Sequence, residues 1–401
     1  MSGVLEGIKV VEVSMWAYVP SAGAVLAEWG ADVVKVEGPE GDPIRQLVVG
    51  GVRSEGPAYT WEVWNRNKSG IALDLTQPEA QEILHELVAR ADVFLTSILP
   101  GTRPKLGIDA DTIRARNPSI VYAAGTGAGP LGPEAGKGGY DSISFWSRGG
   151  VSAGVTPEGQ DPIPMPSGAF GDSLSGIALA AGIAAALVRR SRTGEGCVVE
   201  GALLGTAMWA MQMAIVGAHQ AGIPEMPKST RQTAFNPLVN NYPTSDGRWV
   251  ALCMLQPDVY WEGLCRAIGR EDLVTDPRFS TAEARAQNVR DCVAELDKTF
   301  LAHPLEHWRQ VLSTQRGQWD VVQRAGDLVE DPQAQANGFV QTVTYEGGHV
   351  LPLVSTPVLF DRQLPRLSPA PELSADADAI LASLGWDEER IIEAKVRGAV
   401  V

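Results

Sequence analysis

Residues 8–37 read IKVVEVSMWAYVPSAGAVLAEWGADVVKVE and decide the class of fold. The stretch alternates an apolar strand at 8–13, a helix from about Pro20 to Trp29 that Gly30 stops, and a second strand at 33–37. A strand, a helix and a strand in this order form the βαβ unit, from which parallel sheets with helices on their faces are built. The sequence therefore predicts an α/β fold.

The same alternation continues along the first half of the chain. Thr76 followed by Glu79 is typical of a capping box and predicts a helix that runs to about Ala91. Asp109 or Asp111 could cap a shorter helix further on. The other expected elements are strands at 71–75, 93–96 and 120–124 and long helices at 172–190 and 201–222.

The character of the sequence changes after about Pro224, where we expect a second, smaller domain. The expected division is 1–224 for a large domain, 225–330 for a small domain, and 331–401 for a return to the large domain. The elements expected here are a hairpin at 242–255 turning at Asp246-Gly247, short helices at 261–268 and 307–314, and terminal helices at 374–384 and 387–395.

Composition limits the classes of partner. The 401 residues are 44% hydrophobic and carry a formal net charge of -15, which would repel a nucleic acid backbone but leaves room for local phosphate contacts. The four cysteines show no Cys-x-x-Cys pattern, and we expect a cytoplasmic protein with reduced thiols and no signal peptide. The most apolar run, 176–188, is too short to span a bilayer and predicts a buried helix rather than a membrane anchor.

Two short motifs are interpreted as structural. Gly127, Gly129 and Gly132 spell G-x-G-x-x-G, but prolines and further glycines follow them where a dinucleotide-binding motif would open a helix. His303 and His307 belong to an H-x-x-E-H pattern that lacks a second ligand motif and fits a surface helix. We therefore expect no nicotinamide or flavin cofactor and no metal site.

Asp172 is the candidate catalytic residue. It lies in GAFGDSLSG, residues 168–176, immediately before an apolar helix and among small residues. In this position an aspartate is commonly a helix N-cap. The same geometry would suit a nucleophile, because free amide groups and the helix dipole stabilise an ionised carboxylate. Position alone leaves both interpretations open.

Several phrases in one order make the chain resemble the family III (class III) CoA-transferases, a group that includes formyl-CoA transferase and α-methylacyl-CoA racemases. The phrases are LEGIKVVEVS (5–14), GADVVKVE (30–37), NRNKS (65–69), LPG (99–101), GDSLSG (171–176) and RTGEG (192–196). The resemblance implies a Rossmann-like large domain built from both chain ends, a smaller α+β domain, and two subunits interlocked as a homodimer. It also implies that Asp172 is the nucleophile.

The resemblance further implies that the chain transfers CoA from an acyl-CoA to a free carboxylic acid through a mixed anhydride and an aspartyl-CoA thioester. Coenzyme A is then a substrate, and no permanently bound cofactor is expected. The residues that match family positions lining CoA are Tyr18, Leu73, Ser97, Ile98, Lys105, Leu106, Lys137, Gly138, Gly139 and Tyr140.

Departures from the family pattern limit what the resemblance implies. Ser97 replaces an asparagine, Ala17 replaces a glutamine, and residues 253–257 replace a glycine run, which argues against formyl and oxalate substrates. An α-methylacyl-CoA racemase is the nearest alternative, but that subgroup uses a histidine where this chain has Tyr140, and a neutral tyrosine is a poor proton acceptor near pH 7. A CoA-binding protein without activity is the third alternative.

Overall fold

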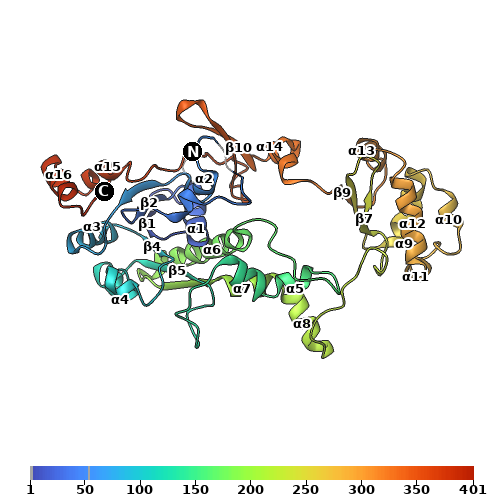
Figure 1. The fold of residues 1–401 in the computed structure, drawn as a ribbon, viewed down its shortest axis with the longest axis horizontal. Coiled ribbons are helices and arrows are strands. Elements are labelled where there is room, and N and C mark those ends of the chain that lie inside the picture. Colours follow the sequence, from blue (N-terminus) through green and yellow to red (C-terminus); the bar gives the residue numbers. More distant parts are fainter. Residues whose placement is uncertain (1–2, 53–54) are drawn as a thin grey trace. The chain divides into compact units, whose positions relative to one another are not determined.

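The computed structural model describes residues 3–52 and 55–401. By their internal contacts these residues divide into two units (Figure 1). Unit 1 comprises residues up to 156, 161–225 and 329–401, and unit 2 comprises 157–160 and 226–328. Unit 1 is thus assembled from segments that lie far apart in the sequence.

A six-stranded parallel sheet forms the centre of unit 1 and confirms the predicted α/β class. Its strand order is β3-β2-β1-β4-β5-β6, which reverses direction between β1 and β4. In sheets of this kind, ligands bind beyond the carboxyl ends of the strands at the point of reversal. The strands are β1 Lys9–Val13, β2 Asp32–Glu37, β3 Ser69–Ala72, β4 Val93–Thr96, β5 Val121–Thr126 and β6 Val198–Ala202.

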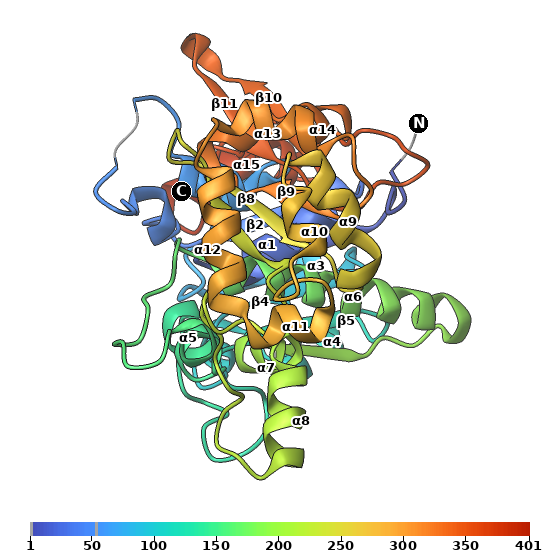
Figure 2. The ribbon, with the colours of Figure 1, turned by 90° about the vertical axis from the view of Figure 1, so that its right-hand side faces the viewer.

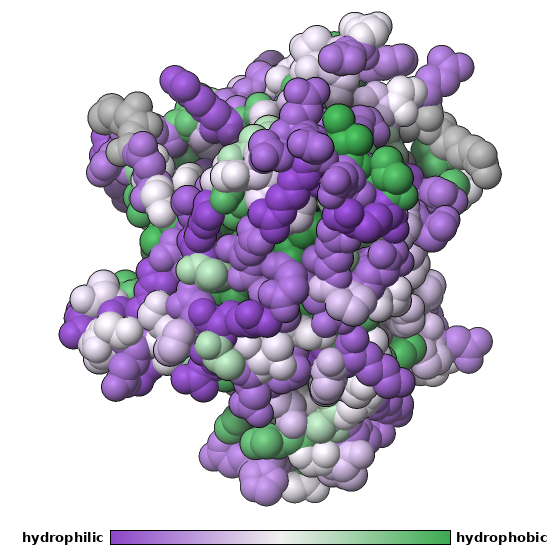
Figure 3. All heavy atoms as spheres, turned by 90° about the vertical axis from the view of Figure 1, so that its left-hand side faces the viewer, coloured by the Kyte–Doolittle hydropathy of each residue, from purple (hydrophilic) through white to green (hydrophobic). Residues whose placement is uncertain are grey.

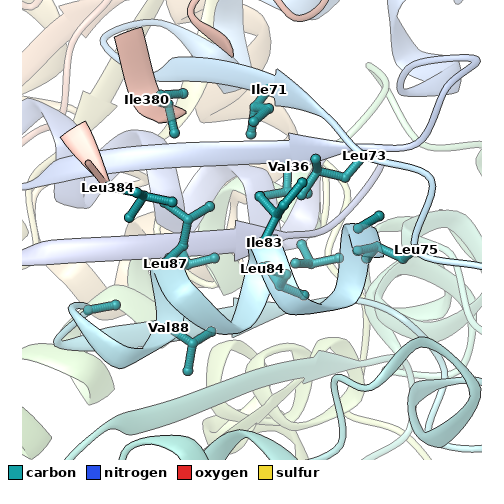
Figure 4. Close-up of a cluster of buried hydrophobic side chains, with 14 of the residues drawn as sticks. Val36, Ile71, Leu73, Leu75, Ile83, Leu84, Leu87, Val88, Ile380 and Leu384 are labelled. Carbon is teal, nitrogen blue, oxygen red and sulfur yellow. The ribbon is translucent and has the colours of Figure 1, made fainter. Parts of the chain in front are cut away.

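Helices cover both faces of this sheet because its strands carry apolar side chains on each side. On one face, α1 Tyr18–Glu28 packs against α6 Phe170–Thr193, and both contribute to one buried cluster. On the other face, α3 Pro78–Ala89 lies beside α15 Ala377–Ser383 near the end of the chain. Figure 4 shows side chains from α3, from the strands and from the final segment meeting in this second cluster.

The remaining elements of unit 1 are shorter. They are η1 Pro43–Gln46, α2 Tyr59–Asn65, η2 Arg103–Leu106, α4 Ala110–Arg116, η3 Ser142–Ser147, α5 Val151–Val155, α7 Leu203–Ala210, α8 Gln212–Ala221, α14 Pro332–Ala336, β10 Val340–Thr344, η5 Glu346–Gly348, β11 Val350–Val354 and α16 Glu388–Val396.

Two sequence-based predictions in unit 1 were wrong. Thr76 does not cap α3, because its hydroxyl donates to Asp74 and the helix begins at Pro78 after Gln77. One continuous helix was expected at 201–222. Its first two residues instead belong to strand β6, and the rest is broken at Met211 into α7 and α8. Asp109 does cap α4, where its side chain accepts a hydrogen bond from the amide of Thr112.

The apolar run at 176–188 belongs to the 24-residue helix α6. By length and composition, α6 is the one helix within residues 3–52 and 55–401 that could cross a membrane, a test that core helices also pass. Its face bearing Gly176, Leu179 and Ile183 is buried, and the helix packs along α1. The apolar residues on this face therefore pack inside the protein.

Unit 2 has its own core around a three-stranded antiparallel sheet (Figure 2). The hairpin forms as predicted, with β7 Val239–Pro243 and β8 Trp249–Cys253 joined through Asp246-Gly247, while β9 Trp319–Val321 is an additional strand. The helical elements are α9 Pro257–Ala267, α10 Asp272–Thr275, α11 Ala282–Gln287, α12 Val289–Phe300, α13 Leu305–Leu312 and η4 Ala325–Glu330.

Polar side chains predominate on one face of the molecule. The face drawn in Figure 3 is mostly hydrophilic, and its hydrophobic side chains gather in small separate groups.

In the H-x-x-E-H segment, His303 precedes α13, and the centroid of its ring lies 4.0 Å from that of His307. Among the described residues, no group of three or more His, Cys, Asp or Glu side chains could hold a metal ion.

Candidate active site

The candidate site lies where the strand order reverses, beyond the carboxyl ends of β1 and β4. The segment after β1 reaches across to the segment after β4, since the amide of Met15 donates to the Ser97 hydroxyl oxygen at 2.9 Å. The next residue, Trp16, has a φ of 68°, which is unusual for a residue with a side chain. A strained conformation of this kind persists only where the surroundings hold it in place.

Buried charges hold this segment from beneath. The Asp42 carboxylate accepts the amide of Trp16 at 3.1 Å and pairs with Lys35 at 3.1 Å. Lys35 also donates to the carbonyl of Ser14 at 2.8 Å and pairs with Glu12, and both charged side chains are fully buried. Each charge in the group has a partner, as burial requires. The loop after β1 is therefore fixed by ion pairs from β1, β2 and the segment after β2.

Asp172 lies in the first turn of α6, but it is not the N-cap. Ala169 occupies that position with a φ of 61°, and Asp172 is the third residue of the helix. The carboxylate that satisfies the helix amides belongs to Asp141, which accepts the amide of Gly171 at 2.7 Å and that of Asp172 at 3.2 Å. The N-cap interpretation of Asp172 is therefore wrong, because a carboxylate distant in the sequence takes its place.

The charge of Asp141 changes the ionisation expected of Asp172. Burial, followed by the nearby Asp141 carboxylate, raises the pKa of Asp172 to about 7. Burial also raises the pKa of Asp141, although the two amides oppose it. The helix amides were expected to keep Asp172 ionised, and this expectation was wrong, because Asp141 already occupies them. No described residue donates a hydrogen bond to the Asp172 carboxylate, which is thus available to react.

Gly171 permits the close approach of Asp141 to the helix. A Cβ atom at this position would lie 2.5 Å from Oδ1 of Asp141 and 2.2 Å from the ring of Phe145. Glycine also brings two backbones together nearby, since a Cβ on Gly127 would lie 2.8 Å from the Cα of Gly139. The glycine run that resembled a dinucleotide motif therefore serves close packing of the segment that carries Asp141.

The predicted CoA contacts differ in how they are placed. Ser97 and Ile98 directly follow β4, and Lys105 and Leu106 lie in η2, so these four lie beyond the carboxyl end of that strand. Leu73 is 1% exposed and packs in the core, so only its backbone could face a ligand.

Tyr18 and the segment from Lys137 to Tyr140 lie nearer to Asp172. Tyr18 opens α1, its hydroxyl is buried without a partner, and burial together with Asp172 raises its pKa. Lys137 pairs with Glu134 at 3.1 Å rather than standing free. A Cβ on Gly138 would lie 3.7 Å from Leu99, which brings this segment to the loop after β4.

Tyr140 is 58% exposed and packs edge to face on Trp16, with 5.8 Å between the ring centroids. Trp16 and Ala169 in turn belong to one apolar group. The strained residue after β1, the segment before Asp141 and the residue that caps α6 therefore meet around Asp172.

Sequence reasoning missed Asp141, Asp42 and Trp16 as parts of the site. Asp141 lies 31 residues before Asp172, and only the folding of the segment after β5 brings the two together. The sequence does place an aspartate shortly after a glycine in both segments, in Gly139-Tyr140-Asp141 and in Gly171-Asp172. Their spacing alone does not predict that the two aspartates lie close together.

Comparisons with known proteins agree on one family. A family model described as CoA-transferase family III matches residues 5–377. The chain is 36% identical to (R)-2-hydroxy-4-methylpentanoate CoA-transferase of Clostridioides difficile, over 96% of this chain and 97% of that protein. It is 31% identical to cinnamoyl-CoA:phenyllactate CoA-transferase of Clostridium sporogenes, over 98% of this chain and 96% of that protein.

A solved structure extends the similarity to three dimensions. The crystal structure of a CAIB/BAIF family protein from Brucella suis superposes with a TM-score of 0.83 and 28% sequence identity. The match covers 96% of this chain and all of that one. The similarity therefore extends along nearly the whole chain.

Proposed function

The chain belongs to the family III CoA-transferases and is a CoA-transferase, and we propose that it works through covalent intermediates on Asp172. The observation that carries this proposal is the Asp172 carboxylate, half-buried in the first turn of α6 and free of hydrogen bonds from the described residues. A nucleophile needs an oxygen that is not already engaged, in a place that excludes most water.

The proposed reaction begins when an Asp172 oxygen attacks the thioester carbonyl of the donor. The C–S bond breaks, CoA thiolate leaves, and a mixed anhydride remains. The thiolate then attacks the aspartyl carbonyl, releases the donor carboxylate and forms an aspartyl-CoA thioester. The acceptor carboxylate reverses these steps, so that acceptor-CoA leaves and the Asp172 carboxylate is restored. Since no step requires a net proton transfer, Asp172 reacts in its ionised form.

We propose Ser97, Ile98, Lys105, Leu106 and residues 137–140 as the groups that contact CoA. Their support is their position beyond the carboxyl ends of β4 and β5, where ligands of such sheets bind. Tyr18 is proposed to contact the acyl part, because its unpartnered hydroxyl lies close enough to Asp172 to sense that charge.

For the substrates, we propose 2-hydroxy acids with a branched or aromatic side chain as acceptors and their dehydrated acyl-CoA counterparts as donors. The support is the pair of relatives named for 2-hydroxy-4-methylpentanoate and for phenyllactate with cinnamoyl-CoA. The first test is incubation of the purified protein with cinnamoyl-CoA and phenyllactate. We expect phenyllactyl-CoA and free cinnamate in equal amounts, measured by mass spectrometry.

The covalent step is tested with cinnamoyl-CoA and hydroxylamine, without acceptor. Hydroxylamine should convert the aspartyl thioester to a hydroxamate on the peptide that contains Asp172. The D172N variant should give none, whereas D387N, which alters the N-cap of α16, should react like the wild type. A hydroxamate on another peptide would contradict the assignment.

The racemase alternative is tested in heavy water with a 2-methylacyl-CoA. A racemase exchanges the α-proton without an acceptor acid, and Tyr140 offers no imidazole for this step. We expect no deuterium incorporation. Incorporation at a rate comparable with CoA transfer would favour the racemase, and absence of both reactions would favour a binding protein.

We also propose an interlocked homodimer. Helix α8 has no buried residue, and large apolar side chains on α7 and α8 are exposed, with Trp209 73% and Met213 87% exposed. Such a surface favours a protein partner, and the family resemblance favours a second copy. Light scattering should give the mass of a dimer, and a mass of one chain would contradict the proposal.

Two further assignments are proposals of the same kind. We propose that residues 1–224 and 331–401 form a large CoA-binding domain and that 225–330 form a small α+β domain, supported by the separate cores of the two units. A cytoplasmic location is supported by the four cysteines, all of which are free.

A further inference from the structure

We propose that Asp141 is a positioning residue that holds the first turn of α6 and whose negative charge drives Asp172 toward its covalent forms. The inference rests on the proposed function and deepens it, because it assigns a role in the same reaction to a residue that does not itself react.

One oxygen of Asp141 is fully used. Oδ2 accepts the amides of Gly171 and Asp172 at 2.7 and 3.2 Å, so the backbone of the nucleophile itself is anchored to this carboxylate. Bonds to an ionised acceptor are stronger than neutral ones, and the N-terminus of a helix favours negative charge. Asp141 therefore fixes the backbone position from which the Asp172 side chain extends.

The other oxygen of Asp141 is buried and has no partner. Oδ1 is buried without a hydrogen bond from any described residue, although a buried carboxylate oxygen is costly to leave unpaired. A cap that served stability alone would be better exposed or fully bonded, as Asp109 is at the start of α4 with both of its oxygens engaged by Thr112. The charge of Asp141 is thus poorly compensated at a place next to the nucleophile.

The uncompensated charge of Asp141 favours the covalent intermediates of the proposed reaction. Ionised Asp172 and ionised Asp141 repel each other across a partly buried site, where repulsion is stronger than in water. Attack on the donor thioester turns Asp172 into a neutral anhydride and then a neutral thioester, and the repulsion disappears in both. It returns only when product leaves. Asp141 therefore raises the energy of the resting carboxylate relative to its covalent forms.

Few ionisable groups besides Asp141 face Asp172. In the part of the chain that the structure describes, Tyr18 from α1 is the other group whose ionisation is coupled to that of Asp172, and Tyr140 precedes Asp141 on the same segment. Burial and Asp172 raise the pKa of Tyr18, so Tyr18 carries no charge at neutral pH, and no described lysine, arginine or histidine offsets the pair. Removal of the Asp141 charge should therefore change the titration of Asp172 directly.

The test compares wild type, D141N and D141E in single-turnover formation of the Asp172 hydroxamate from cinnamoyl-CoA across pH. The wild-type rate should rise with a midpoint near pH 7, as Asp172 loses its proton. In D141N, which keeps the shape but not the charge, the midpoint should fall by about one pH unit or more, and the high-pH rate should drop roughly tenfold. D141E keeps the charge, so its midpoint should stay at the wild-type value even if its rate is lower.

Charge and shape are separated by these two variants. A midpoint in D141N equal to that of the wild type would overturn the proposal, even if the rate fell. So would a D141E midpoint that moved as far as that of D141N. Circular dichroism of each variant and the D387N cap variant at a distant helix control for general loss of structure.

A second measurement needs neither a folded D141N nor an active site. The carboxyl carbon of Asp141 can be followed by NMR in protein labelled with ¹³C-aspartate, in wild type and in D172N. In the wild type the Asp141 signal should show a second inflection near pH 7, where Asp172 ionises beside it, and D172N should lack this inflection. A wild-type Asp141 signal without the inflection would overturn the coupling. If coupling is present but no hydroxamate forms on Asp172, the proposed covalent function fails and the coupling stands.

Discussion

The D172N substitution should stabilise the protein above neutral pH, because the wild-type site holds a carboxylate that resists ionisation. The pKa of Asp172 is raised from its ordinary 3.8 to about 7. Between these values the folded protein keeps a proton that the unfolded chain has released. The contribution of Asp172 to wild-type stability therefore falls as pH rises from about 4 to about 7, and this contribution is constant above.

The size of the effect follows from the width of this window. A difference of about three pH units corresponds to about 4 kcal/mol, and this is an upper value because Asp172 is only half-buried and water screens part of the interaction. An asparagine cannot ionise, so D172N should be more stable than wild type by about 2 to 4 kcal/mol at pH 8. At pH 4 the advantage should shrink to less than about 1 kcal/mol.

The assay is urea unfolding of the full chain at pH 4, 5, 6, 7 and 8, followed by tryptophan fluorescence and circular dichroism. D74N is a control of opposite sign, because hydrogen bonds from Thr76 and Gln77 lower the pKa of Asp74. Its wild-type contribution is present above the unfolded pKa and is lost as pH falls, so D74N should lose stability at pH 8. A D172N advantage that did not grow with pH would refute the reasoning.

Three other substitutions test separate parts of unit 1 and unit 2. K35M should destabilise by about 3 to 5 kcal/mol, seen as a lower unfolding midpoint, because it leaves Asp42 without its buried ion-pair partner and Glu12 with Lys68 alone. No loss of stability would contradict the network. G171A should slow hydroxamate formation roughly tenfold or more, because its Cβ displaces Asp141 and Phe145, whereas G205A in α7 meets only ordinary contacts and should react normally. G263A in α9 adds a methyl group in open space and should stabilise unit 2 by about 0.5 to 1 kcal/mol; destabilisation would show an unrecognised contact.

Local patterns predicted the parts of the molecule that local interactions decide. The alternation at 8–37 gives β1, α1 and β2, and Asp109 caps a helix only three residues away. Strand β6 was not predicted because its residues pair with β5 across about seventy intervening residues and adjoin an apolar helix, so its periodicity is hidden.

The site shows the same limit. Asp172 was predicted as the candidate nucleophile and stays a prediction. The effect of its surroundings on its pKa was predicted with the opposite sign, because burial and the charge of Asp141, which lies in another segment, both raise that pKa. Trp16 and Asp42 lie 26 residues apart, and no pattern links a strained backbone to the carboxylate that holds it. The residue type of Asp172 and its small neighbours suggested a group that could react. Its pKa depends instead on residues that only the folded chain brings near it.

The buried cluster between α3 and residues 377–400 forms late during synthesis of the chain. Leu73 bridges to Val400, and the amide of Val401 donates to the carbonyl of Ala72. The ribosome synthesises these residues after every strand of the parallel sheet. One face of the sheet thus lacks part of its cover, and the nascent chain exposes apolar strand surface, until residues 377–400 emerge. Chaperone binding during synthesis should therefore persist until the last helix is released.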